Sequence, residues 1–224
     1  MGIQGKVVVV AGGTGGLGRV VTPWLSEAGA TVAVLDLGPA QGAPQVQNFF
    51  AADVTNETEV ARVLTDVVNA FGRVDVLINL IGGFTSGQLT KTDLGMWQKM
   101  LMLNVTTAFL LSRAVIPKMT AQRSGRIIHI AARAAVDPFP GAAAYVVSKA
   151  ALVSLIRVLA LELTGTGVTV NGILPTTIDT PANRQSMPTA DPSKWVRPES
   201  IAQILLFLAS DEAGQVNGAL VPVG

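Results

Sequence analysis

Residues 6–18 read Lys6-Val7-Val8-Val9-Val10-Ala11-Gly12-Gly13-Thr14-Gly15-Gly16-Leu17-Gly18, and this stretch decides the fold. The apolar run over 6–11 predicts a buried strand, and the pattern over 16–28 predicts a helix. Glycines between a strand and a helix let the backbone turn tightly and approach a pyrophosphate, which the amides at the helix N-terminus attract. A plain tight turn is the alternative, and the strand-to-helix context argues against it. The residues of this turn predicted to bind a dinucleotide are Gly12, Thr14, Gly15, Gly16, Leu17 and Gly18.

The rest of the chain repeats the alternation of short apolar runs and longer helical patterns. Strands are predicted at 31–35, 47–51, 74–79, 125–131, 168–173 and 219–223. Helices are predicted at 57–71, 144–164 and 198–209, with one or two more over 92–119 that end near Pro117. Strands rich in Val, Ile and Leu that alternate with helices predict a parallel sheet covered on both faces. The sequence therefore predicts an α/β fold, a Rossmann-type doubly wound sheet, as one domain over 1–224.

Composition excludes several classes of function. The chain has 49% apolar residues, 14% charged residues and a net charge of +1, so it gives no electrostatic reason to bind nucleic acid or an anionic membrane. It has no cysteine, which excludes disulfides, thiolate catalysis and zinc–sulfur sites, and no metal site is predicted. The N-terminal residues lack the pattern of a signal peptide, and no uninterrupted apolar run reaches the roughly 18 residues that span a bilayer. We expect a cytoplasmic protein.

Asp36 ends the second predicted strand, eighteen residues after Gly18. A carboxylate at this place can accept both hydroxyls of an adenosine ribose, and it repels a 2′-phosphate. Leu37 and Gly38 follow, and neither offers a cation for such a phosphate. The sequence therefore favours NAD over NADP, while the alternative for Asp36 is a helix cap or a turn residue.

Tyr145 and Lys149 stand four residues apart in the segment Ala144-Tyr145-Val146-Val147-Ser148-Lys149, on one face of a predicted helix. A free phenol has a pKa near 10 and is a poor acid or base at neutral pH. A nearby ammonium favours the phenolate, so we expect Lys149 to lower the pKa of Tyr145. An exposed pair without chemistry is the alternative, because this spacing also arises by chance.

These motifs together resemble the short-chain dehydrogenase/reductase family from one end of the chain to the other. The residues that carry the resemblance fall in the family's order and spacing: the glycine turn, Asp36, Ala52-Asp53-Val54, Asn79, Asn104, Tyr145, Lys149, and Asn171 before Pro175.

The resemblance implies a role for each of these positions. Asp53 and Val54 would flank the adenine, and Asn79 with Gly82 would line the cofactor cleft. Lys149 would bind the nicotinamide ribose, Tyr145 would be the proton donor, and Asn104 would anchor a proton-relay water. Ile178 and Thr180 would meet the nicotinamide amide, and Pro175 would be a further cofactor-binding residue.

The chain departs from the family's pattern at one catalytic position. Ala132 stands thirteen residues before Tyr145, where the family carries a serine, and no serine or threonine lies between Ala131 and Tyr145. Two smaller departures are Asn79-Leu80-Ile81-Gly82, which keeps only the ends of the family's Asn-Asn-Ala-Gly, and Pro175-Thr176, which replaces Pro-Gly. Direct stabilisation of a carbonyl oxygen by a hydroxyl is therefore absent from this segment.

One branch of the family, the dihydropteridine reductases, carries alanine at that position, and the likeness continues beyond it. Residues 175–197, which contain four prolines, are predicted as a substrate lid, and 174–188 are similar to that branch's substrate loop. Gly82-Gly83-Phe84 resembles its Gly-Gly-Trp. Hydride transfer to a conjugated C=N needs an oxyanion donor less than ketone reduction does. The implied substrate contacts are Phe84, Ala132, Tyr145, Asn183 and Met187.

The sequence thus predicts hydride transfer from NADH to a small planar conjugated substrate, with quinonoid dihydropteridine as the example. A carbonyl or alcohol oxidoreductase of the same family, and an NAD-binding sensor or assembly protein with little turnover, are the alternatives. The resemblance also implies a homodimer or homotetramer paired through the helices over 92–119 and 144–164. His129, the only histidine, is predicted to be a buried, hydrogen-bonded strand residue.

Overall fold

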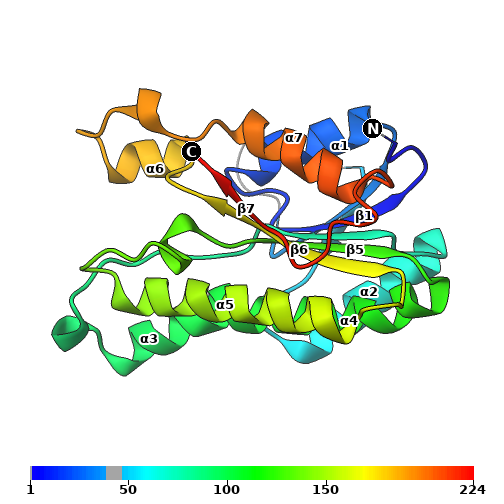
Figure 1. Cartoon of the computed structure of the whole chain (residues 1–224), viewed down its shortest axis with the longest axis horizontal. Coiled ribbons are helices and arrows are strands. Elements are labelled where there is room, and N and C mark those ends of the chain that lie inside the picture. Colours follow the sequence, from blue (N-terminus) through cyan, green and yellow to red (C-terminus); the bar gives the residue numbers. More distant parts are fainter. Residues whose placement is uncertain (1, 39–46) are drawn as a thin grey trace.

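The strands form one parallel sheet in the order β3-β2-β1-β4-β5-β6-β7 (Figure 1). This computed structural model describes residues 2–38 and 47–224. Each strand is short and apolar, as expected for strands covered on both faces. The strands are β1 Val7–Ala11, β2 Thr31–Asp36, β3 Phe49–Ala51, β4 Val76–Asn79, β5 Gly125–Ile130, β6 Val168–Pro175 and β7 Leu220–Val223.

Helices cover both faces of the sheet. On one face lie α1 Gly18–Glu27 and α7 Pro198–Ala209, and on the other lie α2 Glu57–Phe71, α3 Leu94–Leu101, α4 Thr107–Gln122 and α5 Ala143–Glu162 (Figure 1). A π-helical segment, Met102–Thr106, joins α3 to α4. The short helix α6 Pro181–Ser186 and the 3₁₀ turns Leu89–Lys91, Arg133–Ala135 and Pro192–Lys194 complete the elements. The predicted doubly wound architecture is confirmed.

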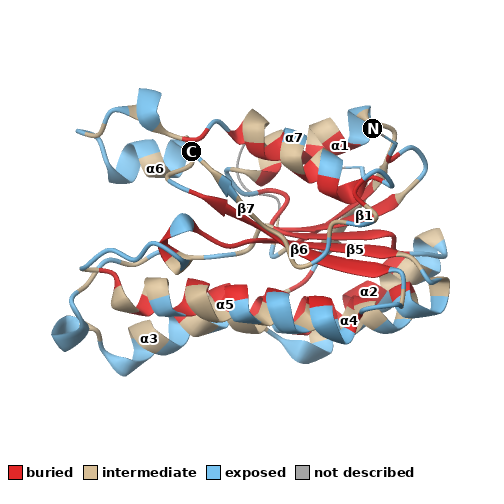
Figure 2. Cartoon of the chain, viewed as in Figure 1, coloured by how far each residue is buried: buried red, intermediate tan, exposed pale blue. Residues whose placement is uncertain are grey.

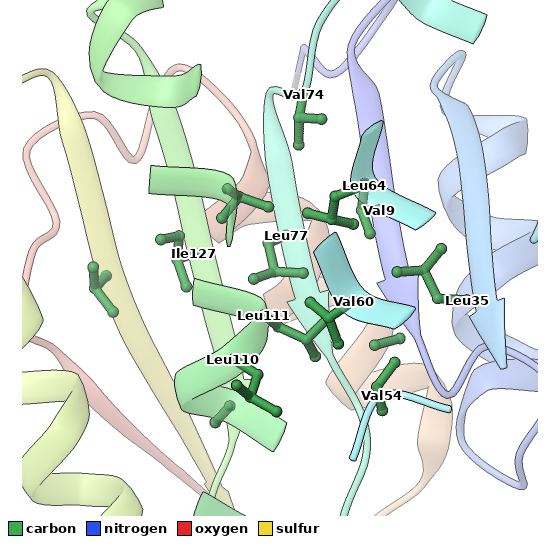
Figure 3. Close-up of a cluster of buried hydrophobic side chains, with 14 of the residues drawn as sticks. Val9, Leu35, Val54, Val60, Leu64, Val74, Leu77, Leu110, Leu111 and Ile127 are labelled. Atoms are coloured by element: carbon green, nitrogen blue, oxygen red, sulfur yellow. The ribbon is translucent and has the colours of Figure 1, made fainter. Parts of the chain in front are cut away.

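Alternating strand residues divide the core into two apolar layers. Val9, Leu77 and Ile127 point toward α2, α4 and α5 (Figure 3), while Ile78 and Ile128 point toward α1 and α7. Both layers are buried, and β1, β4, β5 and β6 are excluded from solvent, whereas the edge strands β3 and β7 are partly exposed (Figure 2). Side chains of successive strand residues point to opposite faces, so each apolar strand contributes to both layers.

The chain reverses its direction of winding at β1, which pairs with β2 on one side and with β4 on the other. In doubly wound sheets, ligands bind outside the carboxyl ends of the strands at this switch point. Gly12 follows β1 there, and Asn79 ends β4 beside it, because Ala11 and Asn79 are paired in the ladder. The topology therefore brings the glycine turn and the cleft residues of the sequence to one edge of the sheet.

The prediction that the helices over 92–119 end near Pro117 is wrong. Helical structure runs from Leu94 to Gln122, and Pro117 lies inside α4. A proline removes one backbone donor but does not end a helix whose inner face is buried on both sides of it. The segment ends instead at Arg123, which has a left-handed conformation with φ of 54°.

Other boundaries differ by a few residues from those predicted. The helix α1 begins at Gly18 rather than at 16, because the glycine turn takes the two residues before it, and β6 continues two residues further, to Pro175. The loop over 175–197 contains α6, which the sequence pattern did not predict. That helix has only six residues, too few to show a periodic apolar face.

Two helical stretches, Leu94–Gln122 and Ala143–Glu162, have the length and apolar composition of membrane spans. In this fold both pack one face against the sheet, as core helices do, and their outer faces are partly exposed (Figure 2). The large apolar side chains exposed along these two stretches are Leu94, Met102, Phe109, Val147, Val158 and Leu161.

Candidate active site

The glycine turn places backbone, without side chains, at the end of β1. Gly12 has φ of 81°, in the left-handed region that favours glycine. At Gly18 a Cβ atom would lie 2.5 Å from the carbonyl oxygen of Gly13, so only glycine fits between the turn and the first turn of α1. This close packing brings the start of α1 directly under the turn.

The N-terminus of α1 is left open. Among the described residues, no side chain caps α1 and no acidic residue stands in its first turn, whereas Asn56 caps α2 by accepting hydrogen bonds from two amides. Uncapped N–H groups and the positive end of the helix dipole form an anion-binding site. Gly16 carries no side chain into this place, where the side chain of Thr180 already lies 3.2 Å from the position of a Cβ. The pyrophosphate of a dinucleotide fits this arrangement.

Asp36 faces the glycine turn from the end of β2. Its Oδ2 accepts hydrogen bonds from the backbone N–H of Thr14 (3.2 Å) and from the Thr14 hydroxyl (2.6 Å), and its Oδ1 accepts one from the N–H of Leu37 (2.9 Å). The carboxylate is therefore oriented by the same turn that would hold the pyrophosphate. The carboxylate is therefore suited to accepting hydrogen bonds from the hydroxyls of an adenosine ribose.

Asp53 and Val54 follow β3 at the same edge. Oδ1 of Asp53 accepts hydrogen bonds from the N–H and hydroxyl of Thr55, and the N–H of Asp53 donates to Glu59. The side chain of Val54 is buried in the apolar layer against α2 (Figure 3). Any contact of Val54 with an adenine must therefore come from its backbone.

Residues of the lid meet the glycine turn directly. Thr180 lies against Gly16 and caps α6, because its hydroxyl accepts a hydrogen bond from the N–H of Asn183. Ile178 is held by a bridge to Val196, and Pro175 ends β6. The fold thus brings Gly16 and Thr180, which the sequence separates widely, to one place.

Asn183 was predicted as a substrate contact, and the structure gives its side chain an internal partner. Its Nδ2 donates a hydrogen bond to the carbonyl of Ile178 (2.8 Å), so the amide braces the lid. Asp179 and Arg184 brace it again through a bidentate ion pair with distances of 2.6 and 2.8 Å. Met187, at the end of α6, is 37% exposed and has an accessible side chain.

Lys149 is held by the end of β5. Only 5% of it is exposed, and its Nζ donates a hydrogen bond to the carbonyl of Ile130 (2.8 Å). Burial lowers the pKa of Lys149 to about 8, because the charged ammonium loses water. The side chain is therefore close to its titration range at neutral pH.

The prediction that Lys149 lowers the pKa of Tyr145 is not met in this structure. Burial raises the pKa of Tyr145 to about 12, because a buried phenolate loses its hydration. The ammonium of Lys149 is directed at Ile130, so desolvation decides the pKa of the phenol. Tyr145 is consequently protonated at neutral pH, which suits a proton donor.

Asn104 lies in the π-helical segment and is only 1% exposed. Its Oδ1 accepts a hydrogen bond from the N–H of Gly83 (3.0 Å), and its Nδ2 donates to the carbonyl of Gly83 (3.0 Å) and to the hydroxyl of Ser148 (2.9 Å). The hydroxyl of Thr107, the first residue of α4, donates a hydrogen bond to the carbonyl of Leu103 in the π-helical segment (2.8 Å). The amide of Asn104 is thus committed to protein partners, and sequence reasoning missed two of them, Gly83 and Ser148.

Gly82 leaves room for this arrangement. A Cβ on Gly82 would lie 2.9 Å from Oδ1 of Asn104 and 3.1 Å from Nζ of Lys149. The side chain of Asn79, at the end of β4, accepts a hydrogen bond from the N–H of Ile81 (3.0 Å) and shapes the same loop. The absence of a side chain at Gly82 is therefore what lets Asn104 and Lys149 converge.

Phe84 lies beside the phenol, and Ala132 holds the position where the family carries a serine. The rings of Phe84 and Tyr145 are 4.9 Å apart, centroid to centroid, at 74°, and 62% of Phe84 is exposed. Ala132 is buried in an extended conformation at the start of a 3₁₀ turn. The site thus pairs an exposed aromatic face with a position that carries a methyl group instead of a hydroxyl.

A hollow of about 390 Å³ continues from Phe84 toward α3. Its lining is mostly apolar, and it is formed by Gly83, Phe84, Thr85, Gly95, Met96, Lys99, Met100 and Leu103. A larger hollow of about 430 Å³ lies between α2 and α4, away from the glycine turn and Tyr145. The first hollow adjoins Phe84, whose ring contacts Tyr145, and the second hollow includes neither residue.

His129 is fully buried in β5, as predicted. Its Nε2 lies 3.0 Å from the hydroxyl of Ser112, while its Nδ1 has no partner among the described residues. Burial, and secondly the charge of Lys149, lower the pKa of His129 to about 3, so the ring is neutral at physiological pH. The fully buried ring of His129 does not reach the cleft.

Comparisons with known proteins agree with this geometry. A family model described as enoyl-(acyl carrier protein) reductase matches residues 11–224. The chain belongs to the short-chain dehydrogenase/reductase family. It is 29% identical to the 3-oxoacyl-[acyl-carrier-protein] reductase of Thermotoga maritima, over 100% of this chain and 98% of that protein. It is 33% identical to a subunit of (2S)-[(R)-hydroxy(phenyl)methyl]succinyl-CoA dehydrogenase from Thauera aromatica, over 100% and 96%.

The fold of this short-chain dehydrogenase/reductase is close to that of a solved structure with cofactor. The structure of NAD⁺-bound xylitol dehydrogenase superposes with a TM-score of 0.89 at 26% identity, over 98% of each chain. Membership in the family and the open cradle at α1 make this chain a nicotinamide-dependent oxidoreductase. A bound nicotinamide nucleotide supplies or accepts the hydride, and this chain's own residues handle the proton and the orientation of the substrate.

Proposed function

We propose that this short-chain dehydrogenase/reductase transfers hydride from NADH to a small planar conjugated substrate, of which a quinonoid dihydropteridine is the example. The observation that carries the proposal is the pairing of a protonated Tyr145 with Ala132 at the place of the usual hydroxyl. The proton donor is retained, and the donor that would hold an oxyanion is not.

The preference for NADH rests on Asp36. Its carboxylate is aimed along the cofactor edge by Thr14, and the residues after it, Leu37 and Gly38, carry no cation. A 2′-phosphate placed there would meet the negative charge of Asp36. NADH is therefore the proposed cofactor, and NADPH is the weaker ligand.

The choice of a planar substrate rests on Phe84. Its exposed ring stands edge-on to Tyr145 and offers an aromatic face beside the proton donor. Aromatic faces bind planar rings through offset or edge contacts worth about 0.5–1.5 kcal/mol beyond the buried area. The matching family model is described by an enoyl substrate, and an enoyl group is itself a conjugated double bond.

In this proposal the residues act in a fixed division of roles. Tyr145 is protonated at neutral pH and donates its phenolic proton to the substrate atom that gains electron density as hydride arrives. Lys149, whose pKa is about 8, holds its ammonium at the carbonyl of Ile130 and would bind the nicotinamide ribose, as the resemblance to the family implies. Phe84 orients the ring of the substrate. Ala132 presents a methyl group where the family carries a hydroxyl.

Carbonyl or alcohol oxidoreduction is the second candidate, and the relatives favour it. The Thermotoga protein is named for reduction of a 3-oxoacyl group, and the Thauera protein for oxidation of a hydroxyl-bearing succinyl-CoA. In this case Tyr145, Lys149 and Asn104 would suffice for a ketone in the absence of a hydroxyl at position 132.

A turnover screen separates the two. Purified protein with NADH is assayed against quinonoid dihydropterin and against a panel of ketones, and the same assays are run on Ala132→Ser and Tyr145→Phe. The proposal expects reduction of the pterin, negligible ketone reduction, and no gain for the pterin in Ala132→Ser. Tyr145→Phe is expected to depress turnover of any substrate, because it removes the proton donor.

Efficient ketone reduction by the wild-type protein without pterin reduction would overturn the proposal in favour of the second candidate. Increased ketone turnover in Ala132→Ser would point the same way, since removing one such donor elsewhere costs on the order of 10²–10³ in rate. NADH binding without any turnover would identify a sensor or assembly protein instead.

We also propose that the chain forms a homodimer or homotetramer through α4 and α5. Phe109, Val147, Val158 and Leu161 expose apolar side chains on the outer faces of these helices. Contiguous exposed apolar residues mark interaction surfaces more often than free ones. Light scattering at micromolar concentration should give a multiple of the chain mass of 23.2 kDa, and a monomer would refute the assembly.

A further inference from the structure

Ser148 occupies the turn of α5 between Tyr145 and Lys149 but points away from the cleft. It is completely buried, and it faces the π-helical segment across the helix packing. Ser148 takes no part in the proposed proton transfer. Its hydrogen bonds nevertheless reach both the residue that donates the proton and the residue that organises the neighbouring loop.

The direction of these hydrogen bonds is fixed. A serine hydroxyl has one proton, and Ser148 donates it to the backbone carbonyl of Tyr145 (2.7 Å). The contact with Asn104 (2.9 Å) must therefore run from the amide N–H to the serine oxygen. The second N–H of Asn104 goes to the carbonyl of Gly83 and its oxygen accepts from the N–H of Gly83, so the amide cannot be reversed without breaking the chain.

The contacts close a circuit around the proton donor. Starting at the backbone of Tyr145, they pass through Ser148 and Asn104 to Gly83. The next residue, Phe84, returns to Tyr145 through the edge-to-face ring contact at 4.9 Å. One hydroxyl thus ties the catalytic helix, the widened helix and the loop after β4 to one another. A break at Ser148 leaves the phenol attached to that loop by a ring contact alone.

We propose that Ser148 is a positioning residue, which sets the ring of Tyr145 against Phe84 through Asn104. It touches neither substrate nor cofactor. The simpler reading is a serine that bonds back to a carbonyl of its own helix, a common local arrangement. That reading needs no amide from another helix, whereas here Asn104 spends one of its two N–H groups on the serine oxygen.

The first test uses the fact that Tyr145 is the only tyrosine in the chain. Isotopically labelled tyrosine therefore gives the nuclear magnetic resonance signals of this ring alone. In Ser148→Ala we expect the ring signals to shift and broaden, because the ring leaves its fixed place beside Phe84. The control is Ser112→Ala, another fully buried serine on a helix, whose hydroxyl contacts His129 instead. Ring signals that move no more in Ser148→Ala than in this control would overturn the proposal.

The second test is kinetic and uses whichever substrate the protein reduces. A displacement of about 1 Å at a reacting group lowers rates by up to about 10². We expect Ser148→Ala to lower kcat ten- to hundredfold with the KM for NADH nearly unchanged, while Ser112→Ala changes neither. Because Ser148 acts through Asn104, adding Ser148→Ala to Asn104→Ala should cost little more. Additive losses, or equal kcat in the two serine variants, would refute the proposal.

The inference rests on the proposed function only for the kinetic test. If pterin reduction fails while the tyrosine signals move as expected, the substrate assignment is wrong and the positioning role stands. If the pterin is reduced while the signals stay in place, the substrate assignment stands and the positioning role is wrong.

Discussion

The cofactor edge and the surroundings of the proton donor are built in two different ways. At the cofactor edge, the contacts that matter are made largely by backbone atoms and by missing side chains. Around Tyr145 the contacts join segments that are 21 and 44 residues apart, and they are made by side-chain amides and hydroxyls. The first region depends on space, and the second depends on complete hydrogen bonding.

This difference decides how each region should fail. Filling a space at the cofactor edge pushes atoms into the backbone and should damage binding or folding outright. Removing one hydrogen bond beside Tyr145 leaves the fold intact and should act on the rate. Substitutions in the two regions separate these modes.

Gly18→Ala should be the most damaging single change at the cofactor edge. The added Cβ would lie 2.5 Å from the carbonyl oxygen of Gly13, against backbone that cannot rotate away. Overpacking of this kind costs about 1–3 kcal/mol or more, so we expect a large loss of the free energy of unfolding together with loss of NADH binding. Urea denaturation and cofactor titration measure the two effects.

Gly15→Ala is the matched control for that change, since its Cβ would meet the carbonyl of Gly12 at 3.3 Å. It should cost much less stability than Gly18→Ala. Equal stability of the two variants would show that space is not what the turn requires.

Gly82→Ala should act on the rate rather than on the fold. Its Cβ would press on Asn104 and Lys149 from 2.9 and 3.1 Å, and both are ends of side chains that can shift. We expect kcat to fall about ten- to a hundredfold through misplacement of these groups. Gly87→Ala, whose Cβ would meet Thr92 at 3.4 Å and the Met96 sulfur at 4.0 Å in ordinary van der Waals contact, should keep its activity in parallel assays. A Gly82 variant that unfolds while keeping kcat would contradict this account.

Asp36→Ala should narrow the preference for NADH over NADPH. The variant loses charge-assisted hydrogen bonds to the ribose, each worth about 1.5–3 kcal/mol, and also the repulsion of a 2′-phosphate. Titration should show NADH binding weakened about tenfold or more, and NADPH binding improved. In Thr14→Val the carboxylate is kept and only its anchoring hydroxyl is lost, so the preference should survive. An unchanged ratio in Asp36→Ala would remove the basis for NAD selectivity.

Lys149→Met should stabilise the folded protein at pH 7 while it abolishes turnover. The pKa of Lys149 falls from 10.5 to about 8 on folding, so the folded state is penalised wherever the lysine is charged. This penalty is complete below about pH 8 and disappears as the pH rises to about 10.5. The variant also loses the hydrogen bond to Ile130. With this loss subtracted, we expect its free energy of unfolding at pH 7 to be higher by about 1–2 kcal/mol.

Urea denaturation of both proteins at pH 7 and pH 10 tests the sign of this effect. The advantage of the variant should shrink toward pH 10, and the titration of Tyr145 is common to both proteins and cancels. An advantage that grows with pH would show that burial is not what lowers the pKa of Lys149.

Local signals predicted most of the fold. The periodic apolar faces of α2 and α7 fixed both of their ends, and the apolar runs located all the strands. The continuation of α4 beyond Pro117 escaped prediction because burial of its inner face, a tertiary effect, outweighs the local penalty of a proline. The helix α6 escaped because six residues carry no periodicity.

For the site, too, local signals predicted one part and missed another. The glycine turn and Asp36 could be predicted from spacing alone, because each stands at the end of a strand that an apolar run marks. Ser148 and Gly83 could not, since their importance lies in which atoms of Asn104 they satisfy, and only the packed helices bring these together. The internal bond of Asn183 was hidden for the same reason. The raised pKa of Tyr145 likewise depends on burial that no spacing reveals.

The π-helical segment at Met102–Thr106 gives the site a dependence on chain length. A π turn amounts to one residue inserted into an α-helix. Deleting a single residue there would let the helix close to regular α geometry and would rotate the residues on one side of the deletion by about 100° relative to the other. Asn104 could then be present and unchanged in type, yet face away from Gly83 and Ser148. Two chains that agree at every polar position of this site can therefore differ in activity through the number of residues between Asp93 and Pro117.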